Sequence, residues 1–168
     1  MKELGLYIHI PFCKQKCLYC DFNSYVCSDA QIESYMEALM KELKSYQEEQ
    51  AYQYKTVFFG GGTPTFIHYK YLGAVMEQLS GYLRPDAEIT MECNPGTVNE
   101  ESLKAYRGMG INRLSIGLQA WQEPLQRKLG RIHDTKQFLL NLEQARAAGF
   151  ANISADLMFA LPEQSLDM

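Results

Sequence analysis

The amino-acid sequence predicts an α/β fold, in which helices cover a parallel sheet that curls toward a barrel. Short apolar runs alternate with segments of helical periodicity, so that four β-loop-α units are followed by a fifth strand. Right-handed crossovers between such units would curl the sheet. A third observation is that cysteine-rich, glycine-rich or polar motifs follow the strands, where α/β folds place their chemistry.

The first strand is the apolar run 4–12, and a cysteine-rich loop follows it directly. Cys13, Cys17 and Cys20 lie close together, separated by three residues and then by two. Pro11 suits the end of a strand, because it has no amide donor and its φ is fixed. Thiolates are soft ligands, so three of them in one loop can converge on one metal centre.

Three interpretations of these cysteines remain open on spacing alone. They could be structural thiols, since free cysteine is often simply buried. They could bind zinc with His9 or a distant residue as the fourth ligand, although zinc ligands usually come in pairs. The later chain offers only the single residues Cys27, Cys93, His68 and His133. The third interpretation is a three-thiolate iron–sulfur cluster whose unligated iron binds another molecule.

A helix and a second strand are expected next. Ser28 and Gln31 form a capping box, and apolar residues recur at helical spacing over 32–43, about five turns in all. The strand 56–59 then leads into the glycine-rich loop 60–65. Consecutive glycines let the backbone approach a ligand closely, because no Cβ intervenes. The loop alone could be a linker, but its position after a strand favours ligand binding.

The third strand is predicted over 87–93, after a helix over 69–83 that Pro85 helps to stop. Glu92 lies near the end of this strand, before the turn at 94–96. A solvated carboxylate is the simpler interpretation of Glu92. Its position favours a polar contact inside the mouth of a barrel.

The fourth and fifth strands also carry polar side chains. Asn99 caps a short helix, and the strand 113–119 ends at Gln119. After a loop over 129–133, Asp134 caps a helix, and the strand 153–159 carries Asp156. The buried stripe expected on that helix is Phe138, Leu139, Leu142 and Ala145. The carboxyl ends of parallel strands share one edge, so these motifs predict a single site there.

Composition narrows the class of protein. The 168 residues are 46% hydrophobic and 21% charged, which suits one globular domain, and the net charge of −4 gives no basic surface for nucleic acid. Five cysteines, three of them clustered, speak against a secreted disulfide framework. No window has the ~18 apolar residues of a membrane span, and no signal peptide is recognisable. We therefore expect a soluble, cytoplasmic protein.

The cysteine loop resembles the signature of the radical S-adenosylmethionine (SAM) superfamily. The motif Y-I-H-I-P-F-C-x3-C-L-Y-C-D-F-N, which starts at Tyr7, resembles that of one branch of the superfamily. This branch contains the oxygen-independent coproporphyrinogen III oxidases and the HemW-type haem chaperones. The resemblance implies a [4Fe–4S] cluster on Cys13, Cys17 and Cys20, with SAM on the fourth iron and its reductive cleavage by the cluster.

Further blocks of that family are matched along the whole chain. They are the glycine loop, E-C-N-P-G at Glu92, S-I-G-L-Q at Ser115, L-G-R-I-H at Leu129 and D-L-M-F-A-L-P at Asp156. The SAM contacts implied by the resemblance are Tyr7, Tyr19, Gly61, Gly62, Thr63, Glu92, Gln119, Arg131 and Asp156.

Two departures from the family pattern shape the expectation. The family has a TIM-like partial barrel of six βα units and a C-terminal domain, so residues 1–168 are expected to be the N-terminal part of the core domain, with the remaining units and that domain absent. The oxidases also carry a cysteine two residues beyond the third ligand, where this chain has Phe22. That difference favours the chaperone branch.

Three functions are therefore carried forward. The first is a protein that binds haem and transfers it to an acceptor protein, with an electron donor for the cluster. The second is the oxidase that converts coproporphyrinogen III to protoporphyrinogen IX. Phe22 argues against this activity, because the oxidases have a cysteine at its position. The third is a zinc-stabilised binding module without redox chemistry.

Overall fold

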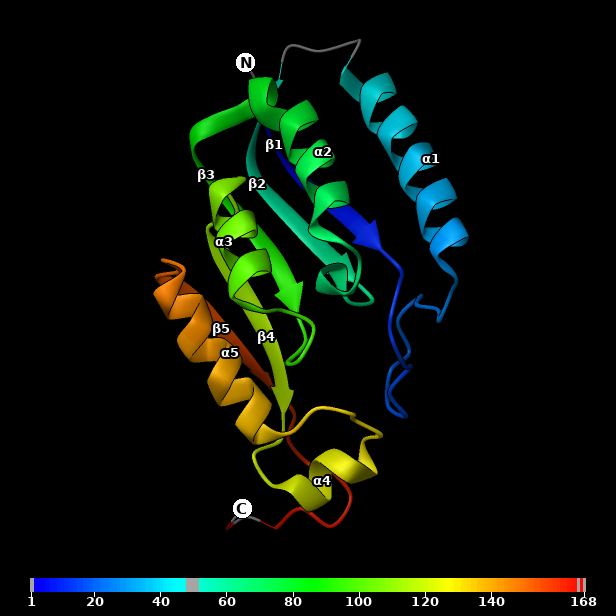
Figure 1. Cartoon of the computed structure of the whole chain (residues 1–168), viewed down its shortest axis with the longest axis vertical. Coiled ribbons are helices and arrows are strands. Elements are labelled where there is room, and N and C mark those ends of the chain that lie inside the picture. Colours follow the sequence, from blue (N-terminus) through cyan, green and yellow to red (C-terminus); the bar gives the residue numbers. More distant parts are fainter. Residues whose placement is uncertain (1, 48–51, 166, 168) are drawn as a thin grey trace.

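A computed structural model describes residues 2–47, 52–165 and 167, and in these residues the fold is one parallel sheet with helices on one face (Figure 1). The strands are β1 (Lys2–Ile10), β2 (Tyr52–Gly61), β3 (Leu83–Cys93), β4 (Arg113–Gln119) and β5 (Asn152–Leu157). Their order in the sheet follows the sequence, β1-β2-β3-β4-β5, and every pairing is parallel. The predicted fold class is confirmed.

The helices cover the apolar face of this sheet. The α-helices are α1 (Asp29–Gln47), α2 (Tyr69–Leu79), α3 (Glu100–Gly108), α4 (Glu123–Lys128) and α5 (Thr135–Ala147). Two short 3-10 turns lie at Pro64–Phe66 and Ser80–Tyr82. In Figure 1, α1, α2, α3 and α5 lie over the same face, while α4 lies beyond the arrowheads of the strands.

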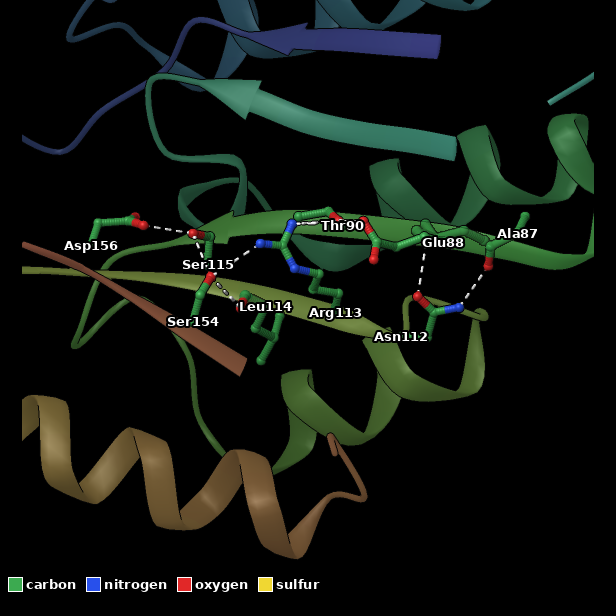
Figure 2. A network of polar contacts seen from close by, with 10 residues as sticks. Ala87, Glu88, Thr90, Asn112, Arg113, Leu114, Ser115, Ser154 and Asp156 are labelled. Carbon is green, nitrogen blue, oxygen red and sulfur yellow. Dashed lines mark hydrogen bonds and ion pairs between the residues drawn. The ribbon is translucent and has the colours of Figure 1, made fainter. Parts of the chain in front are cut away.

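The two faces of the sheet differ in polarity because side chains alternate along each strand. Ile89 and Met91 of β3, and Leu114 and Ile116 of β4, are buried in the main core under the helices. Thr90, Arg113 and Ser115, which alternate with them, lie together on the opposite face of the sheet (Figure 2). That face therefore carries polar side chains that lead toward the carboxyl ends of the strands.

The caps predicted at Asn99 and Asp134 are confirmed. Asn99 accepts a hydrogen bond from the amide of Ser102 and forms a capping box with it. The Asp134 side chain accepts from the amide of Gln137 at 2.7 Å. Ser28 precedes α1 and donates its amide to Gln31 Oε1 at 3.0 Å. The capping box predicted at Ser28 is only half formed, because the Ser28 hydroxyl donates to Gln31 Oε1 instead of accepting from the Gln31 amide. Each cap satisfies a backbone group that the first turn of a helix leaves unpaired.

The helix predicted over 69–83 ends earlier than expected. α2 stops at Leu79, and Leu83 already belongs to β3, so the predicted end of the helix at residue 83 is wrong. The register of β2 with β3 jumps from Leu83 to Glu88, and Pro85 lies within this irregular stretch. A proline without an amide donor fits an irregularity rather than a regular ladder, which explains why the strand tolerates it.

Two further predictions need correction near the carboxyl end. Leu139 was expected in the buried stripe of α5, but it is 42% exposed and Asn141 is buried instead. Asn141 fits because its side chain accepts from the amide of Gly96 at 2.7 Å and donates to the Val98 carbonyl at 3.2 Å. β5 ends at Leu157, and Phe159 is 90% exposed rather than part of the strand.

Candidate functional site

A cavity of about 540 Å³ opens where the carboxyl ends of the strands meet. Side chains from the cysteine loop and from β2, β3, β4 and β5 line it, so segments far apart in sequence share one wall. The predicted site residues in its lining are Cys13, Cys17, Tyr19, Cys20, Gly61, Gly62, Thr63, Glu92, Gln119 and Asp156. The structure thus brings together ten of the twelve residues singled out from the sequence, as the shared edge of a parallel sheet requires.

The three clustered cysteines face this cavity from a largely exposed loop. Cys13 is buried, whereas Cys17 and Cys20 are half-buried. Burial raises the pKa of the Cys17 thiol, and the Arg131 guanidinium opposes that rise. All five cysteines are free thiols. Within residues 2–47, 52–165 and 167, no three His, Cys, Asp or Glu side chains lie close enough to hold a single metal ion.

The other two cysteines have different surroundings. Cys93 is buried among core side chains, and burial raises the pKa of its thiol to about 12. Such a thiol stays protonated at neutral pH and is a poor ligand or nucleophile. Cys27 lies outside the lining of the cavity, just before α1. Cys93 also lines the cavity, so its protonated thiol rather than its position makes it a poor ligand there.

The glycine loop is built into the wall by its backbone. The Gly62 amide donates to the Ile10 carbonyl at 2.8 Å, and the Thr63 amide donates to the Phe12 carbonyl at 2.8 Å. A Cβ on Gly62 would lie 2.8 Å from that Phe12 oxygen, closer than van der Waals contact allows. Gly61 has φ +120°, a conformation that side chains rarely adopt. Glycine is therefore required here to bring the loop against the end of β1.

Glu92 points from β3 toward the glycine loop. Its Oε2 accepts a hydrogen bond from the Gly61 amide at 3.0 Å. Burial raises the pKa of Glu92, the Gly61 amide opposes this, and the nearby carboxylate of Asp156 adds to the rise. Two acidic groups in one cavity favour a cationic or hydrogen-bond-donating ligand.

Gln119 ends β4 in an unusual backbone conformation. Its φ is +67°, in the left-handed region that non-glycine residues seldom occupy. Such conformations cost about 1–3 kcal/mol and cluster at functional sites. The strained backbone changes the direction of the chain where it leaves β4, and Gln119 lines the cavity at this point.

Arg131 and Tyr7, also predicted as site residues, lie outside the lining of this cavity. Arg131 donates to Tyr19 Oη at 3.3 Å, to Asn94 Oδ1 at 3.3 Å and to a backbone carbonyl of β4. Its Nε is buried without a hydrogen-bond partner among the described residues. Tyr7 stacks on Phe58, with ring centroids 6.0 Å apart, and Phe58 lines the cavity. Both side chains support residues that line the cavity.

Sequence reasoning missed several residues of the site. Ser115, Asn94 and Phe58 line the cavity although none was singled out. For Ser115 a signal existed, because it lies two and four residues before Gly117 and Gln119 and so shares their face of β4. The short helix α4 was also missed, since six residues are too few to show helical periodicity. Leu125 of α4 and Leu129, which follows α4, pack with Tyr19 of the cysteine loop.

Comparison with known proteins identifies the family of this chain. The family model described as the radical SAM superfamily matches residues 7–168. The chain belongs to the radical SAM superfamily. It is 40% identical over 164 residues to "Heme chaperone HemW" of Bacillus subtilis, which covers 95% of this chain and 43% of that protein. The HemW of Escherichia coli is 39% identical, over 99% of this chain and 45% of that protein.

A solved structure of radical SAM coproporphyrinogen III oxidase (HemN) from Escherichia coli has a TM-score of 0.88 and 32% identity to this chain. The match covers 96% of this chain and 38% of that protein. The chain thus spans less than half the length of the relatives it matches. The fold is the α/β partial barrel of radical SAM proteins, and membership of this superfamily implies a [4Fe–4S] cluster and SAM as cofactors.

The residues present fit these cofactors. Three thiols face one cavity, as a cluster with one iron left for another ligand requires. The carboxylates of Glu92 and Asp156 suit the cationic groups of SAM, and glycines bring backbone amides to the wall. No helix in the described part of the chain is long and apolar enough to cross a membrane.

Proposed function

We propose that this chain holds the cluster and SAM for a protein of haem metabolism that binds haem and delivers it to acceptor proteins. The observation that carries the proposal is the similarity to curated haem chaperones over nearly the whole chain, at 36–40% identity in five bacteria. Similarity to the oxidase HemN is lower, at 32%.

In this proposal, residues 1–168 are the part of the radical SAM core that binds both cofactors. Cys13, Cys17 and Cys20 hold the cluster, because they are the cysteines of the exposed loop that line the cavity. The bound cofactors supply one-electron chemistry, and the protein supplies orientation and exclusion of water. The glycine loop and the carboxylates of Glu92 and Asp156 line the same cavity and hold SAM.

Phe22 supports the chaperone over the oxidase. It lines the cavity mouth, and its side chain is 69% exposed, so it can pack against the face of a flat ring system. A phenyl ring offers neither a thiol nor a proton to a substrate. The position favours binding of a porphyrin ring without its chemical conversion.

The proposed partners follow from the cofactors. A cluster that is reduced during its cycle needs an electron donor, and haem delivery needs an acceptor protein. The five cysteines are free thiols, which favours a reducing compartment such as the cytoplasm.

The test separates all three candidate functions. The protein is reconstituted anaerobically with iron and sulfide, and then titrated with haem or supplied with SAM, a reductant and coproporphyrinogen III. Stoichiometric haem binding without protoporphyrinogen IX supports the proposal. Multiple turnovers to protoporphyrinogen IX would assign the protein to the oxidases, and zinc in place of a brown iron–sulfur chromophore would assign it to the zinc-binding modules.

A further inference from the structure

A continuous line of hydrogen bonds crosses the polar face of the sheet, opposite the helices, and ends on Asp156 (Figure 2). Arg113 Nη2 donates to Ser154 Oγ at 3.4 Å. The hydroxyls of Ser154 and Ser115 lie 3.0 Å apart, and Ser115 Oγ donates to Asp156 Oδ1 at 2.8 Å. The line joins β4 to β5, and its last two members, Ser115 and Asp156, line the cavity.

The chemistry at the two ends fixes the direction of every bond between them. A guanidinium can only donate hydrogen bonds, and an ionised carboxylate can only accept them. Since Ser115 uses its proton on Asp156, the bond between the serines requires Ser154 to donate to Ser115. Ser154 in turn accepts from Arg113. The Ser154 hydroxyl also lies 3.5 Å from the Leu114 carbonyl, but its contact with Ser115 is shorter, at 3.0 Å. With the Ser154 proton on Ser115, both hydroxyl protons point toward Asp156.

Arg113 is itself held at the start of the line. Its Nη1 donates to Thr90 Oγ1 at 3.3 Å and lies 3.7 Å from Glu88 Oε1. Both partners belong to β3, so the guanidinium is anchored on one side and donates on the other. Side-chain networks of this kind polarise one another and rigidify their members.

The hydrogen bond from Ser115 helps to hold the Asp156 side chain, because β5 itself surrounds that side chain with little packing. β5 is an edge strand of the described sheet, and Asp156 and Leu157 are exposed. A carboxylate has about four acceptor positions. The bond from Ser115 therefore leaves Asp156 able to accept hydrogen bonds from a ligand in the cavity that it lines.

We propose that Arg113, Ser154 and Ser115 are positioning residues that orient the Asp156 carboxylate toward a hydrogen-bond donor of the bound nucleoside cofactor, a hydroxyl or an ammonium group. The inference rests on the proposed function, since it takes SAM as the ligand of this cavity. Arg113 and Ser154 act through Asp156 and lie outside the lining of the cavity.

The first test uses a matched pair at Ser154, with affinity for SAM as the readout. Ser154→Thr keeps the hydroxyl, whereas Ser154→Val removes it at nearly the same shape, and both residues suit a strand. We expect Ser154→Thr to bind SAM within about twofold of the wild type and Ser154→Val to bind about 5- to 10-fold more weakly. Thermal unfolding of both variants monitors the fold. If the two variants bind SAM with equal affinity, the positioning role of Ser154 is overturned, while the proposed function still stands.

The second test is a double-mutant cycle between Arg113 and Asp156. Arg113→Met is expected to weaken SAM binding severalfold in the wild type and to have no further effect in an Asp156→Asn background, because its effect passes through that carboxylate. A general structural role would give the same loss in both backgrounds and would overturn the inference. A reconstituted wild type that binds no SAM would overturn the proposed function along with it.

Discussion

The two loops that line the cavity side by side are built in opposite ways. In the glycine loop, Thr63, Pro64 and Thr65 are buried, and the backbone is bonded to the end of β1. In the cysteine loop, Leu18 and Phe22 are 81% and 69% exposed. That loop is tied to the rest of the chain by few bonds, among them the Leu18 amide to the Leu129 carbonyl at 3.0 Å.

The difference teaches which half of the site the polypeptide pre-organises. Buried backbone hydrogen bonds and close packing fix the glycine loop before any ligand binds. The cysteine loop has little buried apolar surface, so the bonds between its thiolates and a cluster would supply much of its order. The SAM half should therefore respond to changes in packing, and the cluster half to changes in ligands.

The largest expected effect is the loss of bound iron from single changes in the cysteine loop. Cys13→Ala, Cys17→Ala and Cys20→Ala should each abolish iron binding after anaerobic reconstitution, because three thiolates are the minimum for this cluster. Metal and sulfide analysis provides the measurement. Cys27→Ala is the control and should retain the wild-type iron content. Equal loss of iron from the control would remove the distinction between the loop thiols and Cys27.

The next effect concerns packing in the glycine loop. The Cβ introduced by Gly62→Ala would meet the backbone of Phe12 and Pro11 at 2.8–2.9 Å, so a strand end must shift. We expect a loss of about 1–3 kcal/mol in the free energy of unfolding, measured by denaturant titration, together with weaker SAM binding. Gly81→Ala is the control, since nothing lies within 4 Å of its added Cβ. Similar stability of the two variants would mean that the glycine loop is not pre-organised.

A smaller, two-sided effect is expected for Glu92→Gln. Burial raises the pKa of Glu92 above 4.5, so protonation stabilises the folded state and the ionised carboxylate costs stability at neutral pH. The amide oxygen of glutamine can still accept from the Gly61 amide. We expect a higher melting temperature at pH 7 and SAM binding weaker by about 10- to 100-fold.

The pH dependence of Glu92→Gln provides the check. The gain in melting temperature over the wild type should shrink as the pH falls and vanish below about pH 4.5, where the wild-type carboxyl is protonated. A variant that is less stable than the wild type at pH 7 would show that Glu92 serves the fold rather than the ligand.

The smallest effect lies where the two loops meet. His133 shares a small cavity with Cys17 and Thr63, and burial beside Arg131 lowers its pKa to about 4. For a base whose pKa falls on folding, stability is complete above pH 6.5 and is lost as the pH falls toward 4. Because the ring is partly exposed, we expect a loss of about 1 kcal/mol over this window. His133→Gln should flatten that dependence in acid unfolding curves; an unchanged slope would contradict it.

The sequence predicted that its motifs share one edge of the sheet better than it predicted the ends of its helices and strands. The parallel sheet and the shared edge at the carboxyl ends of its strands follow from the alternation of strands and helices. This alternation can be recognised in short segments of the sequence. The end of α2 at Leu79 was not visible, because Leu83 suits a helix and a strand equally and the pairing with Tyr54 decides. The buried Asn141 was also hidden, since its partners, among them Gly96, are distant in sequence.

The position of Arg131 could not be predicted from a motif either. A motif identifies the residue but not which of its neighbours it contacts. In the structure the guanidinium donates to Tyr19 and Asn94 and lies behind the cavity wall. Tertiary contacts of this kind depend on how α4 and the cysteine loop pack together.

The most direct test of the whole site is electron paramagnetic resonance of the reconstituted, reduced protein, with and without SAM. If the cysteine loop carries the cluster and the glycine loop holds SAM beside it, the protein will contain about four iron atoms per chain. The spectrum of the reduced cluster will then change when SAM is added, and Gly62→Ala will weaken the change without lowering the iron content. A full iron complement whose spectrum is indifferent to SAM would contradict the account.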